Sequence, residues 1–176
     1  ELDRSDHERL IEYADEREIT FLSTPFDPES ATMLADLGVR AIKLGSGELD
    51  NHPLLEHVAE LGLPTIVSTG MGTMEEVEAA YRVVDSVVFL HCVSAYPTPL
   101  NEVNLAAMQT LDDRLPCPVG FSDHTMDVRT PGLAVAAGAT VVEKHLTLDR
   151  SMEGPDHEAS LEPDELAAAV DFVETA

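Results

Sequence analysis

The 176-residue chain carries 34 Asp and Glu against 10 Lys and Arg, which gives a formal net charge of −24 at pH 7. A field of that sign repels nucleic acid and anionic membranes, so both are excluded as partners. Hydrophobic residues make up 44% of the chain, enough for a sizeable core, and we expect one domain over residues 1–176. No apolar run is long enough to span a membrane, so a cytoplasmic protein is expected.

Lysine is almost absent from this acidic chain and occurs only at Lys43 and Lys144. Such a composition is favoured in a salt-rich cytoplasm, where dense salt screens the repulsion between like charges. We therefore expect a halophilic source and predict that the protein loses its fold when it is dialysed into low salt. Circular dichroism checks this prediction, and an unchanged spectrum in low salt would contradict it.

Helical patterns and β-rich runs alternate along the chain. The first helix is expected at 5–18, and a second at 28–38 with Asp27 as N-cap and Pro28 in its first turn. Further helices are expected at 73–85, where Thr73 and Glu76 have capping-box spacing, and at 163–176. The predicted strands are residues 19–24, 41–46, 64–69, 87–93, 118–124 and 140–147.

The predicted strands are continuous apolar runs, which is typical of a parallel sheet whose faces are both covered. Each run ends in polar residues, and binding sites of parallel α/β folds lie at the carboxyl ends of the strands. Six polar strand ends favour a barrel mouth over an open doubly wound sheet, which focuses its ligand at one switch point. The sequence thus predicts an incomplete (β/α)8 TIM barrel of about six βα units, strands 3–8, that lacks the first two.

Lys43 and Lys144 both lie inside apolar runs, where a lysine needs a partner. Lys43 stands in "KLGSGE", and a second glycine-rich turn follows Ser68. Lys43 could neutralise a phosphate or carboxylate, or serve as a Schiff-base amine. Because alternate strand residues face opposite ways, Lys144 is expected to point away from Glu143 and His145, into a salt bridge behind the barrel.

His124 and His145 stand at the ends of consecutive strands, so their imidazoles could bind a divalent cation. His91 is interpreted as a hydrogen-bonded core residue. In the loop "EGPDHEAS", Asp156 and His157 could grip hydroxyl groups or act as acid and base. The two cysteines fit no metal-binding or disulfide pattern and are expected to be reduced core thiols.

Seven motifs in order, over about residues 20–166, resemble the sialic acid synthase family: "FLSTPFD", "IKLGSGE", "STGM", "LHCVSAYPTP", "GFSDHT", "EKHLTLD" and "GPDHEASLEPDEL". The resemblance implies a TIM barrel that condenses phosphoenolpyruvate with N-acetylmannosamine, or with a related N-acylated hexose or its 6-phosphate. The products are a nine-carbon 2-keto sugar acid and phosphate. It also implies a homodimer for the full-length protein.

The resemblance also implies roles for individual residues. His124 and His145 match the ligands of Mn2+ or Mg2+, Glu143 lies beside them in the matching motif, and Asp156 matches the residue that holds the acceptor sugar. Lys43 is implied to stabilise the departing phosphate, and at position 144 the family also allows Arg. The implied phosphoenolpyruvate site comprises Thr24, Lys43, Ser46, Ser68, Ser94, Tyr96 and Ser122.

The sequence also departs from the family pattern. A glutamate on the first strand and a lysine on the second contact the reactants in the family, and neither strand is expected here. Many members carry a C-terminal antifreeze-like domain, which has no counterpart here, and some have Asn where Ser94 stands. We therefore expect a piece of a synthase that is inactive or poorly folded alone. The alternatives are a noncatalytic remnant that binds phosphorylated ligands, another phosphoenolpyruvate-dependent barrel, and a Schiff-base aldolase that uses Lys43.

Overall fold

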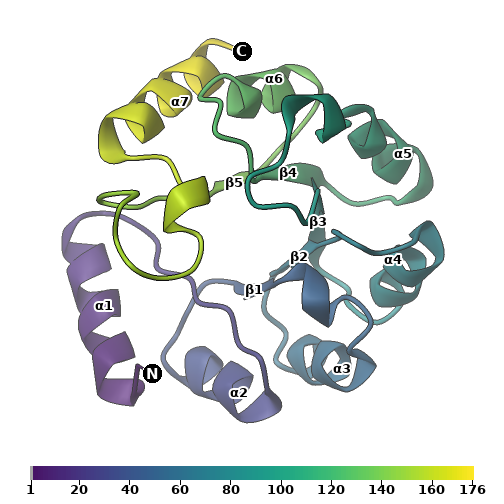
Figure 1. Cartoon of the computed structure of the whole chain (residues 1–176). Coiled ribbons are helices and arrows are strands. Elements are labelled where there is room, and N and C mark those ends of the chain that lie inside the picture. Colours follow the sequence, from purple (N-terminus) through teal and green to yellow (C-terminus); the bar gives the residue numbers. More distant parts are fainter. Residues whose placement is uncertain (1) are drawn as a thin grey trace. The chain divides into compact units, whose positions relative to one another are not determined.

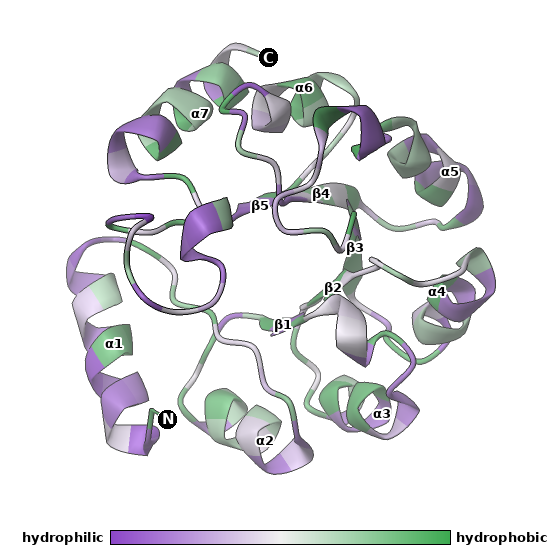
Figure 2. Cartoon of the chain, viewed as in Figure 1, coloured by the Kyte–Doolittle hydropathy of each residue, from purple (hydrophilic) through white to green (hydrophobic). Residues whose placement is uncertain are grey.

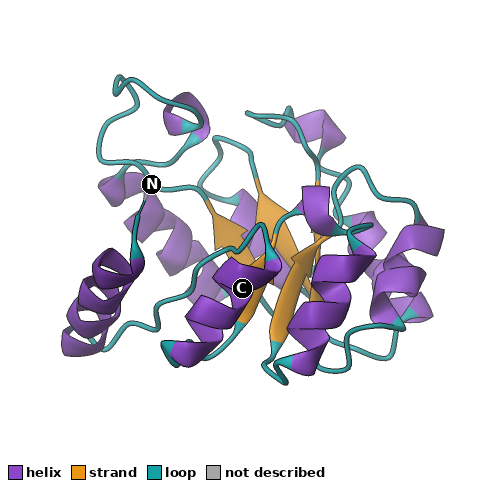
Figure 3. Ribbon diagram, turned by 90° about the horizontal axis from the view of Figure 1, so that it is seen from below, coloured by secondary structure: helices purple, strands orange, loops and turns teal. Residues whose placement is uncertain are grey.

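The computed structural model describes residues 2–176, in which helices alternate with strands along the chain (Figure 3). The chain divides into two compact units. The first comprises the residues up to Val67 together with Glu75–Val87, and the second comprises Ser68–Met74 and Val88–Ala176. Each unit is built from parallel βα elements, as the alternating pattern predicts.

The helices of the first unit are α1 (Arg4–Glu16), α2 (Pro28–Asp36), α3 (His52–Glu60) and most of α4 (Met74–Tyr81). The Asp27 carboxylate accepts the backbone N–H of Ser30 at 2.7 Å, which confirms the predicted N-cap of α2. Asp3 caps α1 through a capping box with Asp6.

The first unit contains β1 (Ile42–Leu44) and, apart from Ser68, β2 (Thr65–Ser68); the two strands run parallel with Leu44 opposite Val67. Leu44 and Val67 are fully buried. The strand predicted at 19–24 is wrong, because these residues form no strand in the structure. A β-strand requires a neighbouring strand to accept and donate its backbone hydrogen bonds. The strand β1, which follows residues 19–24 in the chain, pairs with β2.

The second unit contains β3 (Val87–Cys92), α5 (Ala106–Arg114), β4 (Val119–Asp123), α6 (Thr130–Ala136), β5 (Val142–Lys144) and α7 (Pro163–Thr175). The strands β3, β4 and β5 pair in parallel in that order. All five residues of β4 are buried, the apolar Val119 and Phe121 as well as the polar Ser122 and Asp123 at its end, so both faces of this strand are covered. The largest buried side chains of these strands are Phe89 of β3 and Phe121 of β4, which are 0% and 2% exposed.

Two glycines of the second unit allow close packing. An added Cβ at Gly132 of α6 would lie 2.8 Å from the backbone oxygen of Phe172 in α7, which runs beside α6 (Figure 1). An added Cβ at Gly120 of β4 would lie 2.3 Å from the carbonyl oxygen of Val141. Only a residue without a side chain fits at either position.

Hydrophilic residues dominate α1 and the segment around the short helix η3 (His157–Ala159), as the purple colouring in Figure 2 shows. Within residues 2–176, no helix is long and apolar enough to cross a membrane. Neither Cys92 nor Cys117 forms a disulfide in the described part of the chain; Cys92 is buried as predicted, whereas Cys117 is only partly buried.

Candidate functional site

The ends of β4 and β5 bring four of the predicted site residues together. The register places Ser122 opposite Glu143, and the Ser122 hydroxyl donates to the Glu143 carboxylate over 2.6 Å. Strand alternation puts His124 on the same face as Ser122, with its Nε2 3.3 Å from the Ser122 Oγ. The His145 ring lies 5.3 Å from the His124 ring, centroid to centroid, at 79°.

The hydrogen bonds of His124 determine which of its ring nitrogens carries the proton and which has a lone pair for a ligand. Its Nδ1 is 2.7 Å from the carbonyl oxygen of Val93, which can only accept, so Nδ1 carries the proton of the neutral imidazole. The single hydroxyl proton of Ser122 is directed at Glu143. Burial lowers the pKa of His124 and so favours the neutral ring. The lone pair of Nε2 is therefore available to a cation or a proton.

Tyr96 covers the two histidines. Its ring lies 4.1 Å from the His124 ring at 30° and 5.6 Å from the His145 ring at 71°, centroid to centroid. Partial burial raises the pKa of Tyr96, and the charges of Asp156 and Glu143 add to this effect. The phenol is therefore a hydrogen-bond donor at neutral pH, and its half-exposed position gives it access to a ligand.

The loop after β3 that carries Ser94 and Tyr96 is fixed by hydrogen bonds that the sequence did not reveal. Thr98 is buried, its N–H donates to the carbonyl of His124 over 2.9 Å, and its hydroxyl donates to the carbonyl of Ala95 over 2.8 Å. Ser94 is partly buried on this loop. Thr98 thus joins the loop to the end of β4 and holds Tyr96 over the histidines.

His91 fixes the far end of the same loop, because its Nε2 donates to the carbonyl of Val103 over 2.9 Å. This confirms the prediction of a hydrogen-bonded core histidine. Burial lowers the pKa of His91 below its ordinary 6.5.

The buried His91 should make stability depend on pH. On unfolding below pH 6.5 its imidazole takes up a proton that the folded state does not bind, so its contribution is complete above pH 6.5 and is lost as the pH falls towards the lowered pKa. Urea unfolding at pH 7.5 and 5.5 measures how much the free energy of unfolding falls between these two pH values. This fall should be smaller for His91→Gln, which keeps a donor but does not titrate, than for the unsubstituted protein. Equal differences for both proteins would contradict this.

Asp156 lies on a loop whose two ends are joined. Leu146 and Leu161 form a parallel bridge, and the N–H of Thr147 donates to the carbonyl of Leu161 over 2.9 Å. Within the loop, the Thr147 hydroxyl lies 2.8 Å from Nδ1 of His157. Asp156 is exposed and has a left-handed backbone, with φ of 67°. An exposed carboxylate on a fixed loop can bind hydroxyl groups of a sugar.

Lys144 forms the predicted salt bridge, and its partner is Asp123 of β4. The Lys144 Nζ lies 2.8 Å from Oδ2 of Asp123, and the two side chains are 6% and 0% exposed. Both residues point away from the face that carries His124 and His145, since strand residues alternate. Lys144 also lines a cavity of about 250 Å3, together with residues of α6 and α7.

The other predicted site residues lie elsewhere. Thr24, Lys43 and Ser46 belong to the first unit and are partly buried; the Lys43 Nζ donates to the carbonyl of Leu44 over 2.9 Å, and Ser46 begins the short helix η1 (Ser46–Glu48). Ser68, at the end of β2, is buried and belongs to the second unit. Their predicted contacts with phosphoenolpyruvate stay predictions.

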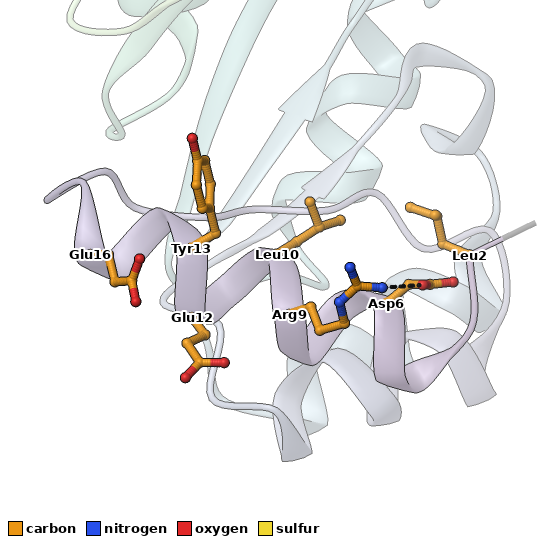
Figure 4. Close-up of a pocket in the computed structure, with 7 residues that line it drawn as sticks. All are labelled: Leu2, Asp6, Arg9, Leu10, Glu12, Tyr13 and Glu16. Carbon is orange, nitrogen blue, oxygen red and sulfur yellow. Dashed lines mark ion pairs between the residues drawn. The ribbon is translucent and has the colours of Figure 1, made fainter.

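A hollow of about 430 Å3 along α1 is a separate feature of the first unit (Figure 4). Arg9 and Asp6 form an exposed ion pair at its edge, with 3.8 Å between the charged atoms. None of the predicted site residues lines this hollow, so it is not the candidate site. Its lining residues are Leu2, Asp6, Arg9, Leu10, Glu12, Tyr13 and Glu16.

His124 and His145, at the ends of β4 and β5, are the residues that could hold a metal ion. Within residues 2–176 there is no group of three or more His, Cys, Asp or Glu side chains that could hold a metal, so a metal on these two imidazoles would need further ligands from water or substrate. The Nε2 of His124 has its lone pair available, and its Nδ1 is fixed by a carbonyl, as is usual for a ligating histidine. Imidazole suits a transition-metal ion better than Mg2+, which prefers oxygen ligands.

Parallel βα units with polar groups at the carboxyl ends of their strands define a protein of the β/α-barrel class. The NeuB family matches residues 1–176, and the chain belongs to this family. The N,N'-diacetyllegionaminic acid synthase of Campylobacter jejuni is 49% identical over 173 residues, which are 94% of this chain and 52% of that protein. The chain thus spans about half the length of the curated relatives it matches.

Solved structures agree with this assignment. The sialic acid synthetase of Leptospira borgpetersenii has a TM-score of 0.96 and 39% identity, over 99% of this chain and 63% of that one. The DAHP synthase of Thermotoga maritima has a TM-score of 0.86 over 99% of this chain and 55% of that one; at 15% identity it shows the fold alone. The predicted fold class, an incomplete α/β barrel, and the resemblance to sugar acid synthases are therefore confirmed.

Proposed function

We propose that the protein containing this chain condenses phosphoenolpyruvate with an N-acylated hexose to give a nine-carbon 2-keto sugar acid and phosphate. Membership of the NeuB family, whose relatives include sugar acid synthases, gives the reaction class. The observation that carries the proposal for these residues is the hydrogen bonding around His124. It leaves Nε2 unprotonated beside His145, on the face of the strands that also carries Ser122 and Glu143.

In this reaction C3 of phosphoenolpyruvate bonds to the aldehyde carbon of the open-chain sugar, water adds at C2, and phosphate leaves. A divalent cation held by His124 and His145 would act as a Lewis acid on the aldehyde oxygen. We propose that Glu143 accepts the proton of the water that adds, since its carboxylate already accepts a hydrogen bond from Ser122 on the same face of the strands.

The remaining predicted residues would bind the two substrates. Lys43, as the lysine of a glycine-rich segment, is proposed to neutralise the phosphate as it departs, with the hydroxyls of Thr24, Ser46, Ser68 and Ser94 as donors to the same substrate. Ser122 is proposed to join them by turning its hydroxyl proton from Glu143 to the substrate when it binds. The Tyr96 phenol, which stays protonated at neutral pH, would donate to a substrate oxygen. Asp156 is proposed to bind hydroxyl groups of the acceptor sugar.

The acceptor sugar is the open part of this proposal. The Campylobacter relative is named for a product with two N-acetyl groups, whereas the Leptospira structure is that of a sialic acid synthetase. The experiment therefore offers the full-length protein phosphoenolpyruvate and Mn2+ in concentrated KCl, with N-acetylmannosamine, its 6-phosphate, or a hexose with two N-acetyl groups. Release of phosphate together with a 2-keto acid of the expected mass is the predicted result with one of these sugars.

Two other outcomes would overturn the proposal. No phosphate release with any acceptor would favour a noncatalytic protein that binds phosphorylated ligands. A covalent adduct on Lys43 after treatment with pyruvate and borohydride would indicate a Schiff-base aldolase instead.

The metal assignment makes a separate prediction. His124→Ala and His145→Ala should each weaken Mn2+ binding more than about 100-fold, because even residues that only orient a ligand typically contribute 10–100-fold. His52→Ala, which removes an exposed histidine of α3, is the matched control and should leave the affinity unchanged. Titration followed by the paramagnetic resonance of free Mn2+ measures this, and an unchanged affinity in both variants would rule out the assignment.

A further inference from the structure

The buried ion pair between Asp123 and Lys144 stands directly behind the two candidate metal ligands. In the register of β4 and β5, Asp123 is opposite Lys144, and Ser122 is opposite Glu143. His124 follows Asp123 in the chain, and His145 follows Lys144. Each histidine is therefore one residue away from one member of the pair, on the other face of the same two strands.

The pair also fixes the backbone on the far side of His124. Lys144 donates to the carbonyl of Thr125 as well as to Asp123, and the second carboxylate oxygen of Asp123 accepts the N–H of Thr125 over 2.8 Å. His124 thus lies between two residues that are both held by the ammonium of Lys144.

Stability alone does not explain a buried ion pair. Removing two charges from water costs about as much free energy as their attraction returns. Well-packed apolar residues of similar volume in place of a buried ion pair therefore often give the protein the same stability. Lys144 lines the same cavity as apolar residues of α6 and α7, so an apolar side chain at this position would have apolar neighbours. What apolar residues could not supply is the directed contact with both Asp123 and Thr125.

We propose that Asp123 and Lys144 are positioning residues that hold the His124 and His145 rings at the separation a shared cation requires. This inference rests on the proposed function, since it assigns a role toward the same cation. Residues behind metal ligands typically change the metal affinity 10–100-fold when they are replaced. The pair would act by fixing the direction of both imidazoles, without contacting the cation or a substrate itself.

The test uses the full-length protein and three variants. Asp123→Asn combined with Lys144→Met removes both charges and keeps an acceptor for the N–H of Thr125. Lys144→Arg keeps the charge and the donors. Leu111→Ala, in α5 of the same unit, is a control that destabilises the core away from the pair. The Mn2+ affinity is measured for each, together with the ring-proton NMR signals of His124 and His145 in the metal-free protein.

We expect the double variant to bind Mn2+ about 10- to 100-fold more weakly. We also expect its histidine ring signals to move, because the rings leave their places beside Tyr96. The Mn2+ affinities of Lys144→Arg and Leu111→Ala should stay within about threefold of that of the unsubstituted protein, because both variants preserve the orientation of the ligands. An unchanged affinity and unchanged ring signals in the folded double variant would overturn the inference.

The two readouts separate this inference from the proposed function. If the unsubstituted protein binds no Mn2+, the metal assignment fails, and the NMR signals alone decide whether the pair positions the rings. If Leu111→Ala weakens Mn2+ binding as much as the double variant does, the effect follows from lost stability and the positioning role is refuted.

Discussion

Replacing Gly120 with Ala is expected to lower the free energy of unfolding by about 3 kcal/mol or more, at the upper end of what overpacking costs. The added Cβ would lie 2.3 Å from the carbonyl oxygen of Val141 and 2.6 Å from a methyl carbon of Leu90. The methyl group of Leu90 can rotate away. The carbonyl of Val141 cannot, because it accepts the N–H of Phe121 over 2.9 Å in the sheet.

Chemical unfolding in urea measures this effect, and Gly47→Ala is its control. An added Cβ at Gly47 meets no atom within 4 Å, and its backbone does not have the positive φ that disfavours a side chain. The control should therefore change stability by no more than about 0.5 kcal/mol, as surface substitutions usually do. Equal stabilities of the two variants would mean that β4 can shift away from Val141.

The consequence for the site is direct, because Gly120 lies in the strand that ends in Ser122 and His124. A shift of β4 that admits the new side chain must alter its register contacts with β3 and β5. The loss of stability should therefore be accompanied by weaker Mn2+ binding. Packing inside the unit and the geometry of the candidate site are thus set by the same strand.

The alternation of side chains along a strand explains why part of the site was predictable. In "TVVEKHLTL" it separates Glu143 and His145 from Lys144, and the structure has Lys144 in the expected salt bridge. The identity of its partner, Asp123, depends on the register of two strands that are 21 residues apart. A single sequence contains no signal for that register, so Asp123 was missed.

Other parts of the site rest on backbone groups, which have no sequence signature. The carbonyl of Val93 fixes the tautomer of His124, and the carbonyls of His124 and Ala95 hold Thr98. The strand predicted at 19–24 failed for a related reason, because its apolar, β-branched composition predicts an extended chain but not a partner. Strand pairing depends on two segments, so the sequence of one segment does not predict it.

Lys144→Met alone is expected to lower the free energy of unfolding by about 3–5 kcal/mol, because it leaves the carboxylate of Asp123 buried without its counter-charge. Asp123 is 0% exposed and would keep the N–H of Thr125 as a donor to Oδ1. Adding Asp123→Asn removes the uncompensated charge and should restore most of this loss. Urea unfolding of the two single variants and the double variant gives the coupling energy of the pair.

Salt distinguishes this buried pair from the ion pairs on the surface. Arg4 and Glu8 on α1 are 51% and 55% exposed, so Arg4→Met should change stability by less than about 1 kcal/mol, and concentrated KCl should reduce even that effect. The pair behind the candidate site is shielded from ions, so the loss caused by Lys144→Met should persist in the same salt. A loss that disappears in concentrated KCl would show that Asp123 becomes exposed to solvent in the variant. In that case the positions of His124 and His145 would have to depend on contacts other than this pair.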